Sequence, residues 1–465
     1  MGGNDDTKSM DTSRVSERDG SRRPAGPANP GSQRLAAFHY RNFTLFWLSQ
    51  VGTNIGSWMQ QLATGWLVLQ LTNSPASLGV NALLQGVPII VFALIGGVVA
   101  DRFDRFRLTI ASQIAYIIPD ATLALLVING SIRVEHVYIY SFVSAAISGL
   151  SNPARQSLVA SLVPRPALLS ALALNSMVWQ GAAVVGPSLA GIALAFWGLP
   201  ANFNLNVLSD FISLGTIMLV RLPRVALERP KSSGWSSVSE GLGYAWRDQR
   251  VRILLTSMAT MTFLARPYTQ LMPVFARDVF NVGPEGLGLM LTMPAAGTIA
   301  AAFILALAGR LPLVRTYLLT SAVLAASLIG FSITRSFPLA LLLLLVIGGC
   351  TSAASTAINT RLQEIVVERL RGRVMSLFMA SNQGSWRLGA TPAGMLADVW
   401  GAPMAIACGA ALLLGALASL ARSRTLWELE SGDGYRRAPM AQREPDGANR
   451  SDAAEATLSP SGKGS

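Results

Sequence analysis

The chain has 465 residues, of which 51% are hydrophobic and 13% are charged; an average soluble domain is about 25% charged, which argues against a water-soluble enzyme. Lys and Arg number 37 against 25 Asp and Glu, a net charge of +12, but the charges are absent from long blocks instead of forming stripes with aromatic residues between them, so we expect no nucleic-acid partner. With only two His and two Cys, the chain lacks the ligands of a zinc cluster, and we expect no metal, no cofactor and no catalytic residue.

Polar, low-complexity sequence flanks the apolar part of the chain on both sides. Residues 1–44 are rich in Ser, Gly, Pro, Arg and Asp, and residues 423–465 are similar apart from an apolar patch at Leu426–Leu429. Such segments bury too little apolar surface to fold alone. We expect both to be disordered cytoplasmic tails.

Uncharged apolar stretches dominate the sequence between these tails. No Asp, Glu, Lys, Arg or His occurs in the 58 residues from Phe43 to Ala100. Since an apolar helix of about 20 residues spans a bilayer, this stretch predicts two spans joined by a turn. The sequence predicts an all-α membrane protein with twelve transmembrane helices. They lie at roughly 45–70, 76–100, 108–129, 136–153, 171–196, 201–220, 253–276, 286–308, 315–333, 337–359, 374–397 and 402–421.

One connection is much longer than the others. Residues 221–252 contain Pro223, Pro230, Gly234 and seven basic residues, which predicts a cytoplasmic linker. It would join an N-terminal bundle of six helices at 45–220 to a C-terminal bundle of six helices at 253–422.

The two halves also resemble each other at a shift of 207–209 positions. A duplicated pair of bundles with a site at their interface suits alternating access, in which one bundle rocks against the other. The coincident residues are Gln61 with Gln270, Leu78-Gly79 with Leu287-Gly288, Gln156 with Gln363, and Asn175 with Asn382.

Basic residues set the predicted orientation, because cytoplasmic loops carry an excess of Lys and Arg. If the N-terminus is cytoplasmic, the short loops on that side hold 18 Lys and Arg, against three in the loops on the other side. Both termini are therefore predicted to be cytoplasmic, which agrees with an even number of spans. We expect the chain in the inner (plasma) membrane.

The loop after the second predicted span carries a motif. Residues 97–107 read GVVADRFDRFR, which resembles the signature G-x-x-x-D-R-x-G-R-R of the major facilitator superfamily. Asp104 stands where that motif has a glycine. An alternative is an ordinary basic cytoplasmic loop with one Asp. In the superfamily this loop latches the two halves in one state of the cycle, which implies a latch role for Gly97, Asp101, Arg102 and Arg105.

Further stretches resemble one branch of this superfamily. Residues 58–61 (WMQQ), 66–69 (WLVL) and 71–75 (LTNSP) are similar to the first helix of bacterial exporters that include the enterobactin exporter and are described as transmembrane secretion effectors. Residues 153–159 (PARQSLV) are similar to the loop after the fourth helix of that group. The resemblance covers about residues 38–422 and implies two pseudo-symmetric bundles.

Gly186, Pro187 and Gly191 lie in the fifth predicted span and resemble the antiporter signature of exporters in this superfamily, which ends in G-P-x-x-G-G. Proline bends a transmembrane helix, and glycine permits close contact with a neighbouring helix. An ordinary kinked span is the alternative reading, and Ala182 and Ala190 replace two of the motif glycines.

Four ionisable residues fall inside predicted spans: Asp120, Asp210, Arg266 and Arg387. Inserting such a residue at the centre of a transmembrane helix costs about 2.5–3.5 kcal/mol of free energy on insertion scales, so these residues usually face protein or water and serve a purpose. The two Asp residues could couple transport to protons, or could form structural salt bridges with Arg. In the resembled fold, the spans of Arg266 and Arg387 normally face the central cavity.

The resemblance also implies which residues line a substrate cavity. A mixture of aromatic and amide groups suits a large amphipathic organic ligand. Trp and Tyr that anchor helices at the membrane interface are the alternative. Besides Arg266 and Arg387, the candidates are Asn54, Trp58, Gln61, Trp179, Tyr268, Gln270, Asn382 and Trp386.

We expect a monomeric secondary transporter that exports a drug, a siderophore or another secondary metabolite. The expected partners are this small molecule, the lipid bilayer and protons as the coupling ion. An importer or lipid translocator of the same fold is one alternative, because fold alone does not fix direction. A membrane enzyme or sensor without transport is another.

Overall fold

The computed structural model describes residues 36–220, 242–309 and 311–430, and every regular element within them is helical. The predicted tails and linker lie largely outside the described residues. Helices suit a bilayer because lipid offers no hydrogen-bond partner, whereas a helix satisfies its own backbone groups. In chain order the elements are η1 (Ala36–His39), α2 (Arg41–Thr72), α3 (Pro75–Arg102), α4 (Arg105–Ile128), α5 (Val134–Ser161), η2 (Arg165–Ala167), α6 (Leu168–Met218), α8 (Gln249–Ala265), α9 (Tyr268–Val274), η3 (Phe275–Val279), α10 (Gly283–Ala308), α11 (Leu313–Ile333), α12 (Phe337–Ile365), α13 (Glu368–Trp400), α14 (Ala402–Ala421) and α15 (Arg424–Glu430).

Seven helices in the described part of the chain are long and apolar enough to cross a membrane: α3, α4, α6, α10, α11, α12 and α14. The helices α2, α5, α8 and α13 are not in this set: polar residues interrupt their apolar sequences, and α8 is in addition only 17 residues long. Most of the polar side chains predicted to line a central site lie on three of these mixed helices or beside them: α2, α8 and α13.

Three local breaks shape the helices. Asn73 ends α2 in the left-handed conformation (φ 51°) and donates its backbone N–H to Leu69 O at 2.9 Å, a C-cap that Asn and Gly favour. Gly198, with φ 75°, turns the chain inside α6, so that α6 consists of two helical segments. Pro267 separates α8 from α9 directly after Arg266.

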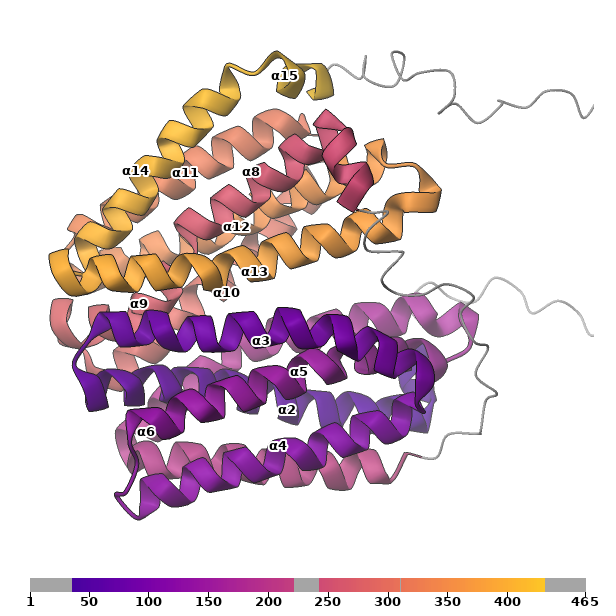
Figure 1. The fold of residues 1–465 in the computed structure, drawn as a ribbon, viewed down its shortest axis with the longest axis vertical. Helices are drawn as coiled ribbons and strands as arrows, with labels where there is room; N and C mark the ends of the chain where they lie inside the picture. Colours follow the sequence, from indigo (N-terminus) through magenta and orange to yellow (C-terminus); the bar gives the residue numbers. More distant parts are fainter. Residues whose placement is uncertain (1–35, 221–241, 310, 431–465) are drawn as a thin grey trace, which may run out of the picture.

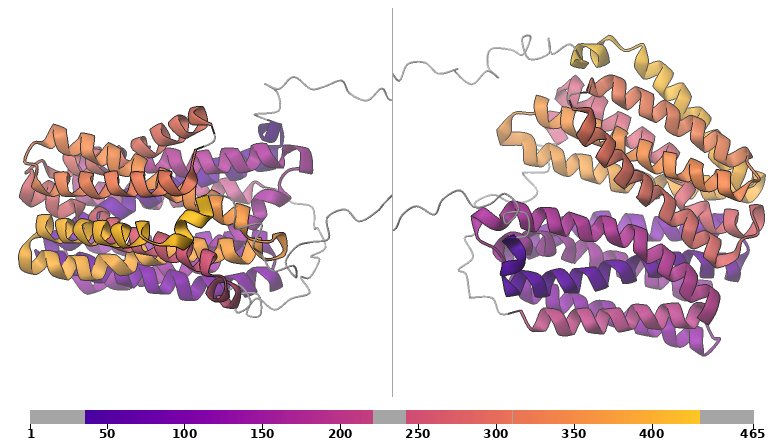
Figure 2. Two further views of the ribbon diagram at one scale, coloured as in Figure 1. Left: turned by 90° about the horizontal axis from the view of Figure 1, so that it is seen from above. Right: turned by 180° about the vertical axis from the view of Figure 1, so that it is seen from behind.

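The helices form two bundles that lie side by side (Figure 1). In the first, α2 packs on α6, α3 on α5, and α4 on both α5 and α6. In the second, α12 packs on α10 and α11, while α13 packs on α8 and α14. The main contacts between the bundles are α3 with α13 and α6 with α10, and the right view in Figure 2 shows the same separation into two layers.

The structure differs from the sequence prediction at the tail expected for 423–465, because Arg424–Glu430 forms the helix α15. Leu426 and Leu429 are spaced for one face of a helix and are buried against the C-terminal bundle. The Glu430 carboxylate accepts the backbone N–H of Val314 at 2.8 Å, in the first turn of α11. Similarly, α8 begins at Gln249, inside the predicted linker, where Asp248 caps it.

Candidate functional site

Two close helix crossings join the bundles. A Cβ built on Gly191 in α6 would lie 2.9 Å from Pro284 O and 3.1 Å from the Gly288 Cα in α10. A Cβ built on Gly394 in α13 would lie 2.8 Å from Pro75 O and 3.0 Å from the Gly79 Cα in α3. Glycine is therefore required for both crossings as they stand.

These crossings are related by the internal repeat. Pro75 and Gly79 coincide with Pro284 and Gly288 at a shift of 209 positions. Each Pro carbonyl faces a glycine of the other bundle, and each repeat glycine lies against that same partner. The duplicated sequence thus builds the same interface twice, once on each side of the molecule.

The antiporter-like residues lie at one crossing. Gly191 faces α10 as described, and a Cβ built on Gly186 would lie 2.5 Å from the Cβ of Trp58 in α2. Pro187 is buried, and its carbonyl oxygen lies against Gly288. The three residues therefore set how α6 packs on its neighbours in both bundles.

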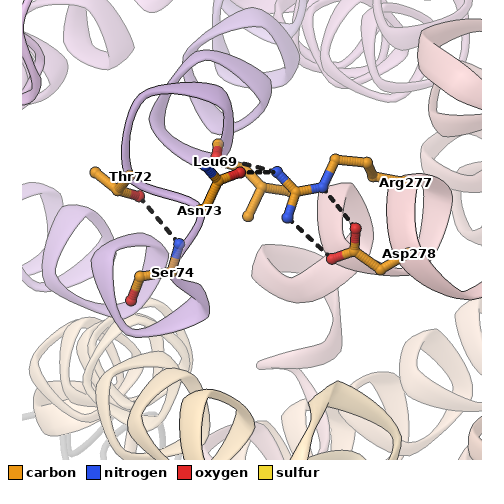
Figure 3. A network of polar contacts seen from close by, with 6 residues as sticks. All are labelled: Leu69, Thr72, Asn73, Ser74, Arg277 and Asp278. Carbon is orange, nitrogen blue, oxygen red and sulfur yellow. Dashed lines mark hydrogen bonds and ion pairs between the residues drawn. The ribbon is translucent and has the colours of Figure 1, made fainter.

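Polar contacts close the interface near these crossings, at the end that holds the α2–α3 turn and η3 (Figure 3). Arg277 donates from Nη1 to Leu69 O at 3.2 Å and to Asn73 Oδ1 at 2.9 Å. The Asp278 carboxylate pairs with Arg277 Nε at 2.6 Å and holds the guanidinium in place. We call Leu69, Asn73, Arg277 and Asp278 the lock.

A second contact strengthens the same end. Asp398 at the end of α13 accepts the Ser74 hydroxyl at 2.6 Å and the Ala76 backbone N–H at 3.5 Å. We call this side of the molecule the closed end, because bonds from both bundles meet here. The sequence analysis did not identify the lock or Asp398. Two sequence features could have pointed to these contacts. Asn73 lies in a tight turn between two predicted spans, and charged residues lie at the end of a further predicted span.

The C-terminal bundle contains a cationic cluster at the break between α8 and α9. Arg266, the last residue before Pro267, donates from Nη1 to Asn382 Oδ1 at 3.2 Å. Its Cζ lies over the Trp386 ring at 4.5 Å from the centroid, and the Cζ of Arg387 lies over the same ring at 5.3 Å. Four predicted cavity residues, from α13 and from the end of α8, are thus brought together: Arg266, Asn382, Trp386 and Arg387.

Neighbouring groups fix this cluster. Trp386 donates from Nε1 to Thr269 Oγ1 at 3.0 Å, which sets the orientation of the indole. A Cβ built on Gly86 in α3 would lie 2.6 Å from the Arg387 Cβ, so Arg387 lies directly against the other bundle. The cluster therefore occupies the interface between the bundles.

The other predicted cavity residues do not join this cluster. Trp58 and Trp179 lie together in the N-terminal bundle, with ring centroids 6.3 Å apart, and Trp179 is exposed. Asn54 is buried and donates to Gln50 O of its own helix at 2.7 Å. Tyr268 is buried in the apolar core. Gln61 and Gln270 are half-buried.

The two buried Asp residues belong to one polar network in the N-terminal bundle. Tyr140 in α5 donates to Asp120 Oδ1 at 2.8 Å, and Gln113 in α4 donates to Asp210 Oδ1 at 3.1 Å. Arg155 joins this network by donating from Nη2 to Gln113 Oε1 at 2.8 Å. The Asp120 and Asp210 carboxyl groups interact electrostatically, and we call them the carboxyl pair.

This arrangement differs from the Asp–Arg salt bridge considered from sequence. Within the described residues, neither Asp120 nor Asp210 forms an ion pair, because Gln113 stands between Asp210 and Arg155. Two neighbouring carboxylates in an apolar bundle repel each other when both are ionised, and a proton on one of them removes that repulsion. The network therefore has the chemistry of a proton-binding site.

The motif loop joins α3 to α4 on the N-terminal bundle. Gly97 and Arg102 belong to α3 and Arg105 begins α4; Arg102 is exposed. The Asp101 side chain lies outside the described residues. Asp104, the departure from the family motif, caps α4 by accepting the Arg107 backbone N–H at 2.8 Å. An N-cap carboxylate satisfies one of the free N–H groups at a helix start, which explains why Asp fits this position.

Comparisons with known proteins agree on one family and one fold. Residues 32–448 match the family described as transmembrane secretion effector. The chain is 26% identical over 353 residues to the staphyloferrin A transporter of Staphylococcus aureus, which covers 75% of this chain and 87% of that protein. It is 25% identical over 297 residues to macrolide efflux protein A of Streptococcus pyogenes, which covers 63% of this chain and 72% of the relative.

A solved structure shares the fold. A bacterial homologue of the human lysosomal transporter Spinster, solved in an inward-facing and unoccupied conformation, superposes with a TM-score of 0.66 at 15% identity. The superposition covers 87% of this chain and 99% of that one.

Proposed function

Because the chain belongs to the transmembrane secretion effector family of the major facilitator superfamily, and is thus a multi-pass membrane transporter and not an enzyme, we propose that it is a proton-driven exporter of small organic molecules. The observation that carries this proposal is the family match over residues 32–448, together with efflux proteins among the relatives. The substrate class proposed is a drug, a siderophore or another secondary metabolite.

The proposed topology has twelve spans and both termini in the cytoplasm. In this count α6 contributes two spans, because the chain turns at Gly198, and α8, α9 and η3 contribute one interrupted span. The halves that rock against each other are residues 45–220 and 253–422, joined by the linker at 221–252. The transporter works as a monomer in the plasma membrane.

In this topology the closed end faces outward, so the conformation is inward-facing. The supporting argument is charge: the motif loop, with Arg102 and Arg105, connects α3 and α4 at their ends away from the α2–α3 turn. Cytoplasmic loops collect such basic residues. The Spinster homologue with the same fold is described as inward-facing as well.

The carboxyl pair is the proposed proton site. Asp120 in α4 and Asp210 in α6 lie in the N-terminal bundle without an ion-pair partner among the described residues, and Tyr140 and Gln113 hold them in position. Proton gain or loss would change the bond between α4 and α6. The loop residues Gly97, Asp101, Arg102 and Arg105 act as the latch on the cytoplasmic side.

The test of export compares a deletion strain, an overexpression strain and the parent. Drug resistance and secreted metabolites are measured together, since they report ligand class and direction. We expect overexpression to raise resistance or secretion, and an uncoupler to abolish the gain. Net accumulation of the same compounds would instead identify an importer. Fusions of a cytoplasm-active reporter to each terminus test the topology, and termini on opposite sides would contradict it.

A further inference from the structure

We propose that the substrate carries an anionic group, a carboxylate or a phosphate, and that Arg266 and Arg387 bind it beside Trp386. This inference rests on the proposed transport function, because it names the chemical class of the exported molecule. It starts from two guanidinium groups held over one indole ring, at 4.5 and 5.3 Å from its centroid.

The charges of these two side chains are not balanced by the chain. Within the described residues, neither Arg266 nor Arg387 forms an ion pair with a carboxylate. Arg387 makes no hydrogen bond there either, and its described polar partner is the face of Trp386. The two cations lie against one ring and repel each other, and burial makes the repulsion stronger than in water. An anion bound by both would offset this repulsion.

Many donors in the cluster remain available. A guanidinium has five N–H donors, and Arg266 uses one of them on Asn382 Oδ1. Because Oδ1 is occupied by Arg266, the Asn382 Nδ2 group is a further donor beside it. The planar fork of Arg matches the oxygens of carboxylate and phosphate groups, which it binds bidentately.

The local structure favours a ligand over a purely structural role. Trp386 is already oriented by its hydrogen bond to Thr269, so the cluster needs no second Arg to hold the ring. The Arg387 Cβ lies against Gly86 of the other bundle, so a ligand bound here contacts the interface that moves in alternating access.

The test measures binding on the purified full chain in lipid nanodiscs, without transport. The probes share one aromatic ring and differ in head group: naphthoate, naphthyl phosphate, the neutral naphthamide and the cationic naphthylmethylamine. Each is titrated at fixed ionic strength, adjusted with sodium chloride, while the unfolding temperature and tryptophan fluorescence are recorded. We expect at least one anionic probe to raise the unfolding temperature and the neutral and cationic probes to leave it unchanged. Comparing the shift in unfolding temperature caused by naphthoate with that caused by naphthyl phosphate distinguishes a carboxylate site from a phosphate site.

Variants locate the site. Arg266→Gln and Arg387→Gln should each weaken anion binding by roughly tenfold or more, the loss expected for a hydrogen bond between charged groups. Arg387→Lys keeps the charge but loses the planar fork, so binding should be weaker than in the parent. Arg335→Gln, which removes an exposed Arg outside the cluster, is the matched control and should bind normally. Each variant is first required to match the parent in yield and in unfolding temperature without probe.

Several outcomes would overturn the anion site. They are equal stabilisation by neutral and anionic probes, stabilisation that chloride reproduces, and anion binding that survives both Gln variants. Efflux of neutral compounds that is unaffected by Arg266→Gln and Arg387→Gln would also overturn it and leave the exporter proposal standing. Anion binding that the Gln variants abolish, in a chain with no efflux phenotype, would support the site and contradict export.

Discussion

Arg277 in η3 donates to the Asn73 side chain at 2.9 Å, and this bond joins residues that are 204 positions apart. Each of the two side chains is positioned by residues next to it in the sequence. Asn73 adopts a left-handed C-cap that turns its amide outward, and Asp278 aligns the guanidinium. In the proposed alternating-access cycle this contact would break, so the bond should report on the conformational equilibrium.

Removing the lock should open the closed end. In Arg277→Ala, the bonds to Asn73 and Leu69 are lost, and a hydrogen bond to a charged group contributes about 1.5–3 kcal/mol. We expect the outward-open population to rise by roughly tenfold or more. The reporter is Ala390→Cys, a buried position at the α3–α13 crossing, in a chain whose Cys350 and Cys408 are replaced by Ser. The labelling rate by a thiol reagent should increase.

The control for this measurement is Arg335→Ala, which removes an exposed Arg and should leave labelling of Ala390→Cys unchanged. Equal labelling rates in Arg277→Ala and in the parent would contradict the role of the lock.

The crossing of α6 and α10 should tolerate no side chain at Gly191. A Cβ there would lie 2.9 Å from Pro284 O, so Gly191→Ala must force the helices apart, at a cost of about 1–3 kcal/mol. We expect reduced efflux, with protein still inserted in the membrane. Gly181→Ala in the same helix is the matched control, since a Cβ at Gly181 meets nothing within 4 Å. If both variants export equally, the crossing is not a constraint on transport.

Neutralising the carboxyl pair should uncouple export from protons. In Asp120→Asn the side chain can no longer gain or lose a proton, so efflux driven by a pH gradient in proteoliposomes should be abolished. Downhill exchange of substrate should persist. Tyr140→Phe, which deletes the donor to Asp120, should weaken the coupling, whereas Tyr138→Phe on the same helix should not. Normal gradient-driven efflux in Asp120→Asn, with only lower expression, would assign Asp120 a structural role.

The latch prediction concerns Asp101. We expect Asp101→Asn to impair efflux several-fold while leaving insertion and yield intact, because the charge and not the volume is removed. Asp104→Asn is the control, since Asn caps a helix about as well as Asp does. Efflux at the parental rate in Asp101→Asn would count against the latch.

Sequence predicted the helical fold because hydropathy is a local property. The residues Arg266, Asn382, Trp386 and Arg387 could also be selected in advance, because ionisable residues within spans are rare and the family resemblance implied which spans line a cavity. Their mutual contacts could not, because they depend on how α13 packs on α8. The choice between a proton-coupling role and an Asp–Arg bridge stayed open for the same reason, because Gln113 lies between Asp210 and Arg155 only in the folded bundle.

The contacts of the lock could not be predicted from the sequence, for a different reason. Arg277 and Asp278 are adjacent, so their ion pair carries no information about tertiary structure. The partner Asn73 resembles any other turn residue until the two bundles are placed together. The α15 helix was missed because its apolar patch is short, and its burial depends on a groove formed by distant helices.

The short segment α9–η3 follows Arg266, which caps the end of α8, and carries Arg277 in its last turn. The separation is eleven residues, or roughly 16 Å along a helix. The chain bends at Pro267, and Thr269 donates its backbone N–H to Arg266 O across the bend at 3.1 Å. A ligand that binds Arg266 would therefore act on the same short stretch of chain that carries Arg277, and occupancy of the cationic cluster would be communicated to the lock along it.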